Sequence, residues 1–290
     1  MAIFHLAAKV ISRTKKQNAV AAAAYRSAIR LTDFATGEVK RYADRKTRVI
    51  FSRIYAPPDA PAWARDREQL WNRVEAIETR RNSCLAREYE IALPSELSDV
   101  QRIWLMEDFV RENFTRLGLI VDANVHDPDR DADARNYHVH LMVPERQVGA
   151  GGFARTKIRS LQQREFLYTL RAQFSHLANR HLQRHGHAAR IDHRTLKAQG
   201  SQNEADIHLG YIAGQIERRG GLSERGEIRR KIRARNAERR ASDLAQAMAR
   251  SAAAVAEARH RHYEAAADEH MEELDFQATQ DIWGKPLGPR

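Results

Sequence analysis

The sequence contains a single cysteine, Cys84, and lacks any long apolar run. One cysteine excludes the disulfide framework on which many small secreted domains depend. No apolar signal-peptide segment opens the chain, and no stretch of roughly 18 or more apolar residues is present to span a bilayer. We therefore expect a cytoplasmic protein that does not insert into a membrane.

Acidic residues are fewer than basic ones. The chain of 290 residues has 38 acidic and 49 basic side chains, a formal net charge of +11 and a pI near 10.0. A folded protein this basic most often binds nucleic acid, and the planar arginine side chain suits phosphate well. The alternative is a basic surface that is merely solvated.

Two histidines two positions apart give the first chemical signal. In residues 136–143, His138 and His140 alternate with apolar residues, which is typical of a β-strand. Side chains two apart on a strand face the same way, with Cα atoms about 7 Å apart. Both imidazoles then reach one divalent ion at about 2.0–2.2 Å. The alternative is a pair of buried, hydrogen-bonded rings.

A third histidine precedes this pair. Residues 119–126 have the pattern of a strand that ends at His126, and the polar residues 127–135 predict a turn that pairs the two strands antiparallel. His126, His138 and His140 then form a three-histidine set. Such a set leaves coordination positions open, as a catalytic metal site requires.

Two glutamates show the same spacing as the histidine pair. Residues 86–94 alternate like a strand and place Glu88 and Glu90 on one face. Adjacent like charges are unfavourable unless a cation or hydrogen-bond donors lie between them. We interpret the pair as part of a site, and the alternative is the solvated face of an edge strand.

A metal ion in a basic protein suggests phosphodiester chemistry, with water or a side chain as the nucleophile. Tyr25 is a candidate because residues 21–24 are alanines, which leave room beside its ring for a nucleic-acid backbone. A tyrosine has a pKa near 10 and needs a base or a nearby cation to attack well. Glu88 or Glu90 could accept its proton. The alternative is a helical tyrosine that packs in the protein core with its hydroxyl at the surface.

Several further elements are predicted. We expect a central strand at residues 2–11, a helix at 17–31, a strand at 49–55, a helix that begins at Ser98 with a capping box to Gln101, and a long helix at about 160–184. His181 and His185, near the end of the last helix, are interpreted as favourable partners of its dipole rather than as zinc ligands.

Basic residues follow the glycine-rich residues 149–152, which we expect to form a loop that can approach a ligand closely. We predict that Arg155, Lys157 and Arg159, together with Arg26 next to Tyr25, contact DNA. Beyond residue 201 we expect a short helix at 204–217, a hinge at 218–221 and a charged, alanine-rich helix from 224 to about 270. Its basic first half is either solvated or in contact with DNA or a partner.

Five separated blocks of the sequence together resemble the MobA/MobL relaxases, the MOBQ class of plasmid-mobilisation proteins. The resemblance covers roughly residues 1–220, and the blocks lie at residues 1–6, 22–26, 86–94, 135–140 and 192–210. It implies an α+β fold of the HUH relaxase type: about five antiparallel strands flanked by helices, with a mostly helical C-terminal extension. The long polar insert at residues 129–135 leaves the register of His126 open.

The resemblance also implies an activity. Tyr25 would attack the scissile phosphate at the nic site of an origin of transfer, leaving a 5′-phosphotyrosine and a free 3′-OH, and would later allow the strand to be rejoined. His126, His138 and His140 match the metal triad of the family, which holds Mn²⁺ or Mg²⁺, although three imidazoles also suit Zn²⁺ or Ni²⁺. Glu88 and Glu90 match its acidic pair, and which of them accepts the proton is open.

The implied partners are single-stranded origin-of-transfer DNA, accessory mobilisation proteins and the coupling protein of a type IV secretion system. We expect a relaxase domain at residues 1–200 and a basic helical extension at 201–290. Many relatives continue into a helicase, a primase or a secretion-signalling tail. The chain is therefore either a compact mobilisation protein or the amino-terminal part of a larger one.

Two other functions stay open. A rolling-circle replication initiator shares the HUH site, but no second tyrosine lies within four residues of Tyr25, as the two-tyrosine version would require. A non-catalytic DNA-binding accessory protein would use the histidines for structure, and its binding would depend on salt but not on metal.

Overall fold

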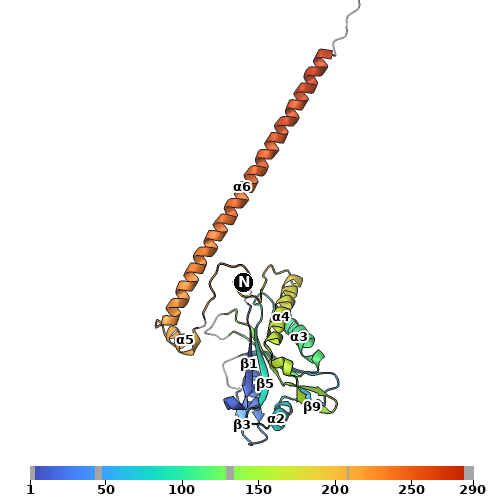
Figure 1. Cartoon of the computed structure of the whole chain (residues 1–290), viewed down its shortest axis with the longest axis vertical. Coiled ribbons are helices and arrows are strands. Elements are labelled where there is room, and N and C mark those ends of the chain that lie inside the picture. The colour runs from blue at the N-terminus through green and yellow to red at the C-terminus, as the bar shows by residue number, and fades with distance from the viewer. Residues whose placement is uncertain (1–3, 43–47, 129–133, 208, 284–290) are drawn as a thin grey trace, which may run out of the picture. The chain divides into compact units, whose positions relative to one another are not determined.

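The chain forms two compact units, Met1–His193 and Arg194–Arg290. The computed structural model describes residues 4–42, 48–128, 134–207 and 209–283 (Figure 1). The five-stranded sheet and four α-helices belong to the first unit, and a helical pair belongs to the second.

The first unit is built on one antiparallel sheet. Each pair of neighbouring strands is antiparallel. In spatial order the strands are β1 (Leu6–Ser12), β5 (Cys84–Ala92), β7 (His138–Val143), β6 (Val121–His126) and β4 (Val49–Tyr55). This is the expected α+β architecture, with β5, β7 and β6 in the middle of the sheet.

The prediction that the first strand lies centrally is wrong. β1 pairs with β5 alone and forms one edge of the sheet. The strand is apolar because Leu6 and Ile11 are buried in the core, whereas Lys9 is exposed. An apolar pattern shows which residues are buried, but strand order depends on packing between distant segments.

The two faces of the sheet differ in chemistry because side chains alternate along each strand. One face is apolar: Tyr89 and Ile91 of β5 and Leu141 of β7 pack against helices α3 (Asp99–Asn113) and α4 (Arg164–Arg184). These two helices lie side by side next to the sheet (Figure 1). The buried cluster includes Phe109, Val110, Phe174, Leu177 and Leu182.

The other face carries the polar residues of the same strands. Helices α1 (Ala19–Ser27) and α2 (Arg67–Ile77) cover part of it with a second apolar cluster, which includes Val20, Leu70, Trp71 and Met142. The rest of this face holds the histidines and glutamates singled out above. The alternation predicted for residues 86–94 and 136–143 therefore assigned the glutamates and histidines to the correct face of the sheet.

Helix boundaries follow their capping residues. The predicted capping box of α3 is present: Ser98 accepts from the backbone of Gln101, whose side chain accepts from the Ser98 backbone. The predicted helix at 17–31 is too long. Asn18 caps α1, and Ala28 ends it with a left-handed φ of 51°. The following β2 (Arg30–Thr32) pairs with β3 (Val39–Arg41).

The glycine-rich residues 149–152 form a hairpin turn rather than a loose loop. They join β8 (Arg146–Gly149) to β9 (Gly152–Lys157), a two-stranded sheet that the sequence pattern did not predict. The helix expected from residue 160 begins later, at Arg164. Four short 3₁₀ segments complete the first unit: Arg13–Lys15, Ala62–Arg65, Thr115–Leu117 and Arg159–Gln162.

The second unit contains α5 (Gly210–Arg218) and α6 (Glu224–Trp283). The predicted helix at 204–217 begins later than expected: Glu204 and Asp206 lie outside any helix or strand and bind arginines of α6. Within the described residues, no helix has the length and apolar character needed to cross a membrane.

Candidate active site

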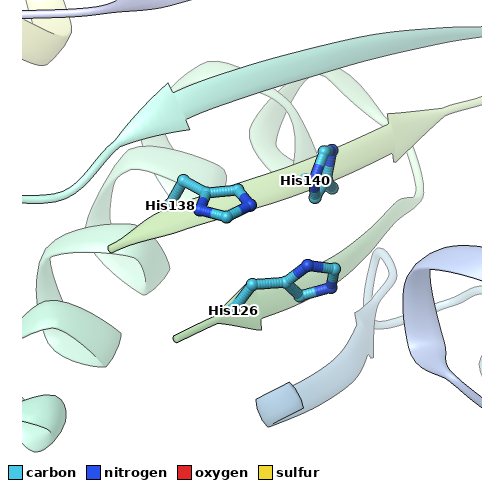
Figure 2. A group of neighbouring side chains, drawn as sticks. All are labelled: His126, His138 and His140. Carbon is cyan, nitrogen blue, oxygen red and sulfur yellow. The ribbon is translucent and has the colours of Figure 1, made fainter. Parts of the chain in front are cut away.

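Three histidines meet on the polar face of the sheet. His138 and His140 project from β7, and His126 of β6 lies opposite His138 in the antiparallel register. The expected turn therefore pairs the strands as predicted, although residues 129–133 of the insert lie outside the described residues. Figure 2 shows the three rings side by side on these strands. Their centroids are 4.9–5.3 Å apart.

Each imidazole is held by one of its two nitrogens. The partners are two backbone carbonyls and one carboxylate. The bonds join His126 Nε2 to the Arg26 carbonyl at 2.7 Å, His138 Nδ1 to the Asn136 carbonyl at 2.9 Å, and His140 Nδ1 to Glu88 Oε1 at 2.8 Å. Histidines that bind metals usually donate their second ring N–H to a carbonyl or carboxylate in this way.

The histidine cluster fits a divalent metal ion. One possible ligand atom from each residue lies within 4.8 Å of the other two. Burial lowers the pKa of His126 to about 4, and the neighbouring His140 and His138 add to this effect. The ring is therefore neutral near pH 7, which is the form that binds metal. Three nitrogen ligands leave positions open for a substrate oxygen.

Glu88 links the histidine cluster to helix α1. Its two oxygens accept from Nε and Nη2 of Arg26 at 2.5 Å each, and one of them also contacts His140. Only 2% of the Glu88 side chain is exposed. Burial alone would raise the pKa of this carboxyl, but the bonds from His140 and Arg26 outweigh it and lower the pKa to about 2. Glu88 is therefore ionised and fully engaged.

Glu90 lies directly opposite His140 in the register of β5 and β7. It forms an ion pair with Lys9 of β1 and is more exposed than Glu88. Burial raises the pKa of Glu90, but the hydrogen bond and charge of Lys9 outweigh it, so that its pKa is lowered. The two glutamates share a face, as expected, but have different partners.

Helix α1 brings Tyr25 to the same site. Ala19, Val20, Ala23 and Ala24 are buried against the core, whereas Tyr25 is 42% exposed. Because the carbonyl of Arg26 accepts from His126, the end of α1 is tied to the histidine cluster one residue after the tyrosine. The ring of Tyr25 packs edge-on against Tyr42, with centroids 5.5 Å apart.

One open cavity of about 810 Å³ joins these groups. Tyr25, Arg26, Glu88, Glu90 and all three histidines line it. Its wall also carries four lysines that the sequence analysis did not single out. These are Lys9, Lys15, Lys16 and Lys40. The adjacent Lys15 and Lys16, which precede the N-cap Asn18 of α1 by two residues or more, were a signal in the sequence for two of the four.

The other residues predicted to contact DNA lie elsewhere in the first unit. Arg155 and Arg159 are exposed, and neither they nor Lys157 lines this cavity. Lys157 forms ion pairs with Glu78 at 2.9 Å and Glu145 at 3.4 Å, so its charge is balanced inside the protein. A DNA contact of Arg155, Lys157 and Arg159 stays a prediction.

His181 has a structural partner. It is 3% exposed, and its Nε2 lies 3.0 Å from Asp108 of α3. Among the residues that the structure describes, the group of His126, His138 and His140 is the set of three or more side chains able to hold a metal. The contact with Asp108 gives His181 a partner inside the protein. The interpretation of His181 and His185 as partners of the helix dipole stays a prediction.

An antiparallel sheet with a three-histidine cluster on its polar face, covered in part by a helix that carries a tyrosine, defines the class: an α+β protein with the HUH relaxase fold. The model of the MobA/MobL family matches residues 17–219 of the chain. The chain belongs to this family.

Two curated relatives illustrate the likeness. The mobilization protein MobL of Acidithiobacillus ferridurans is 36% identical over 259 residues, which cover 78% of this chain and 66% of the relative. The probable mobilization protein MobA of Bifidobacterium longum is 33% identical over 278 residues, which cover 81% and 48%. The chain thus spans between about half and two thirds of the length of these relatives.

A solved structure shares the fold. It concerns the molecular basis of vancomycin resistance transfer in Staphylococcus aureus, is 30% identical, and superimposes with a TM-score of 0.61. The match covers 67% of this chain and all of the other.

Proposed function

We propose that the protein is a metal-dependent relaxase that nicks single-stranded DNA at the nic site of an origin of transfer and thereby initiates plasmid mobilisation. The observation that carries this proposal is that Tyr25 and the three histidines line one cavity. Membership of the MobA/MobL family supports it, since relatives are named as mobilization proteins.

The step is a transesterification. The Tyr25 hydroxyl oxygen attacks the scissile phosphorus, the bond from phosphorus to the 3′ oxygen breaks, and a 5′-phosphotyrosine and a 3′-OH result. The phenol proton passes to a carboxylate, and the departing 3′ oxygen takes up a proton. A divalent ion bound by His126, His138 and His140 would polarise a non-bridging phosphate oxygen. One phosphodiester replaces another, so the reverse attack by a 3′-OH rejoins the strand.

The two glutamates have different proposed roles. Glu88 is a positioning residue, because Arg26 and His140 occupy its oxygens and its pKa is lowered to about 2. A carboxylate with so low a pKa is a weak proton acceptor. We assign proton acceptance to Glu90, which also lines the cavity and is more exposed. Within the described residues its ion pair is with Lys9 alone, although Lys9 outweighs burial and lowers the pKa of Glu90 as well.

The cavity wall supplies the contacts to the DNA backbone. Lys9, Lys15, Lys16 and Lys40 line the same cavity as Tyr25. Lys9 also pairs with Glu90, and Lys40 with Glu38. Lysines neutralise phosphates and release counterions. Arg26 contributes less directly, since its guanidinium is occupied by Glu88.

We propose Mn²⁺ as the functional ion, with Mg²⁺ as a weaker-binding functional substitute. Three imidazoles provide nitrogen ligands, which Mg²⁺ accepts poorly, and manganese lies at the weak-binding end of the transition series. Zn²⁺ or Ni²⁺ would bind the same ligands more tightly. We also propose action in the cytoplasm with accessory mobilisation proteins and a type IV coupling protein.

The test uses a single-stranded origin-of-transfer oligonucleotide and a divalent ion. The unsubstituted protein should form a covalent adduct that migrates slowly in denaturing gels, and Tyr25→Phe should form none. Tyr42→Phe is the matched control because its ring touches Tyr25, and it should retain the adduct. Strand cleavage that persists in Tyr25→Phe would remove the assignment. DNA binding without cleavage, unaffected by EDTA, would instead identify an accessory DNA-binding protein.

A further inference from the structure

Helix α6 packs against the rest of its unit near its start, whereas the side chains farther along the helix are exposed. Near its start, Ile232 and Asn236 are buried against the preceding segment. Every residue from Ala241 to Ala266 is exposed, including Leu244, Met248 and Val255, which are 62%, 66% and 52% exposed. A surface helix normally buries one apolar stripe, so these exposed apolar residues indicate a missing partner.

The exposed apolar residues follow a heptad repeat. Leu244, Met248, Ser251 and Val255 are spaced four, three and four residues apart, and the same spacing continues outward from Ala234 to Ala265. We call these ten positions the heptad seam. Eight of them are apolar and two, Ser251 and His262, are polar: the seam consists of Ala234, Ala237, Ala241, Leu244, Met248, Ser251, Val255, Ala258, His262 and Ala265. The interval from 234 to 265 contains ten charged residues, and none of them falls on the seam. This pattern is typical of the a and d positions of a coiled coil.

The seam does not coincide with the side of α6 that packs inside the unit. Ile232 and Asn236 face the segment before the helix, whereas Ala234 and Ala237 on the seam are exposed. The seam is therefore open over its whole length, about 48 Å at 1.5 Å rise per residue.

We propose that the heptad seam binds the seam of a second copy of this chain as an antiparallel coiled coil. The seam is symmetric about a point between Ala249 and Arg250. In the antiparallel register centred there, Leu244 meets Val255 and Met248 meets Ser251, so a large side chain faces a large one at one layer and a small one at the next. Ala241 meets Ala258 in the layer beyond.

Charge decides between antiparallel and parallel pairing. Residues 225–240 contain eight basic and two acidic side chains, and residues 264–275 contain six acidic and no basic ones. Glu204, Asp206 and Glu217 bind arginines of the first stretch, which still leaves an excess of three positive charges. Antiparallel pairing brings the basic stretch of one copy alongside the acidic stretch of the other. Parallel pairing would place each stretch beside its own like charge.

The residues beside the seam allow the two helices to approach closely. The flanking positions nearest its centre are Ala245, Ala247, Ala252 and Ala254. Small side chains at such positions reduce the distance between helix axes, which compensates for the modest size of the seam residues.

A cross-linking experiment on the full chain tests the orientation. Leu244→Cys and Val255→Cys are prepared separately and treated with a short bismaleimide, alone and as an equimolar mixture. The antiparallel register predicts a cross-linked dimer in the mixture and little in either protein alone. Efficient cross-linking of each single variant to itself would overturn the orientation. The unsubstituted protein controls for Cys84.

Sedimentation tests the association itself. The unsubstituted protein should be dimeric at tens of micromolar, and Leu244→Asp should raise the dimer dissociation constant about a hundredfold or more, because each dimer loses two buried leucines. Ala253→Asp adds the same charge on the opposite side of α6 and should leave the dimer intact. A monomeric unsubstituted protein, or equal effects of the two substitutions, would overturn the proposal. Circular dichroism checks that both variants keep their helix.

Discussion

At the scale of single residues, two side chains, Arg26 and Glu88, connect the tyrosine helix to the histidine cluster. Arg26 provides a carbonyl for His126 and a guanidinium for Glu88, and Glu88 in turn holds His140. The position of the tyrosine helix and the orientation of two histidines are therefore coupled through one arginine and one glutamate. The spacing of Glu88 and Glu90 predicted their shared face, but no pattern in the sequence predicted that Arg26 would pair with one of them.

Replacement of Glu88 tests this coupling. Glu88→Gln keeps the shape of the side chain but removes the charge that orients His140, and it should weaken Mn²⁺ binding about 10–100-fold. Isothermal titration with Mn²⁺ measures the effect without any DNA. Glu107→Gln, on the opposite face of the sheet, is the control and should bind as tightly as the unsubstituted protein. Unchanged affinity in Glu88→Gln would contradict the proposed positioning role.

Cys84 provides a test that depends on pH. Burial raises the pKa of its thiol to about 12, and the carboxylate of Glu145 adds to the shift. A raised pKa leaves little thiolate at moderate pH, so alkylation by iodoacetamide near pH 8 should be at least about 100-fold slower than in the urea-unfolded chain. The rate should still rise between pH 9 and about pH 11. A plateau at the pH of an ordinary thiol would contradict this environment.

At the scale of secondary-structure elements, local patterns predicted much and long-range packing decided the rest. The capping box of α3 and the strands that carry the histidines and glutamates follow from residues that are close together in the sequence. The edge position of β1 depends on its pairing with β5, which lies far along the chain. The hairpin of β8 and β9 and the strand pair that follows the early end of α1 are local, but the residue pattern did not reveal them. Hydrophobic periodicity indicates which face of a strand or helix is buried, but not which element packs against it.

One buried carboxylate attaches α2 to the sheet. Asp122 of β6 is fully buried, accepts two bonds from Arg67 at 2.8 Å and one from the Trp71 indole at 2.9 Å. Asp122→Ala should lower the free energy of unfolding by about 3–5 kcal/mol because it leaves Arg67 unpaired. Urea unfolding followed by near-UV circular dichroism measures this loss.

The control for that experiment caps the same helix. Asp66 accepts from the Gln69 backbone at the start of α2. Its replacement by alanine should cost only about 1 kcal/mol. Equal effects of Asp66→Ala and Asp122→Ala would show that the buried network adds nothing beyond an ordinary helix cap.

At the scale of the whole molecule, the net charge of +11 predicted a nucleic-acid partner but not where it binds. The fold brings Lys9 of β1, Lys40 of β3 and the adjacent Lys15 and Lys16 to the cavity that Tyr25 also lines. Composition cannot reveal such a grouping, because it arises only when β1, α1 and β3 pack together. The histidine pair, by contrast, lies on one strand and was visible in the sequence.

Salt dependence locates the DNA backbone. For a short single-stranded oligonucleotide, Lys15→Ala combined with Lys16→Ala should reduce the slope of log affinity against log salt by about 1.4, or about 0.7 for each lost phosphate contact. Arg155→Ala combined with Arg159→Ala removes the same charge outside the cavity and should change the slope less. A slope unchanged by loss of the two lysines would contradict a DNA path through the cavity.

The central claim is that the hydroxyl of Tyr25 becomes covalently attached to DNA. Mass spectrometry of the trapped adduct after trypsin digestion tests it directly, because cleavage after Lys16 and Arg26 releases residues 17–26, which contain Tyr25 as their only tyrosine. The account predicts that this peptide carries the 5′-phosphorylated nucleotide. A nucleotide attached to the peptide that contains Tyr42, or to any other residue, would contradict it.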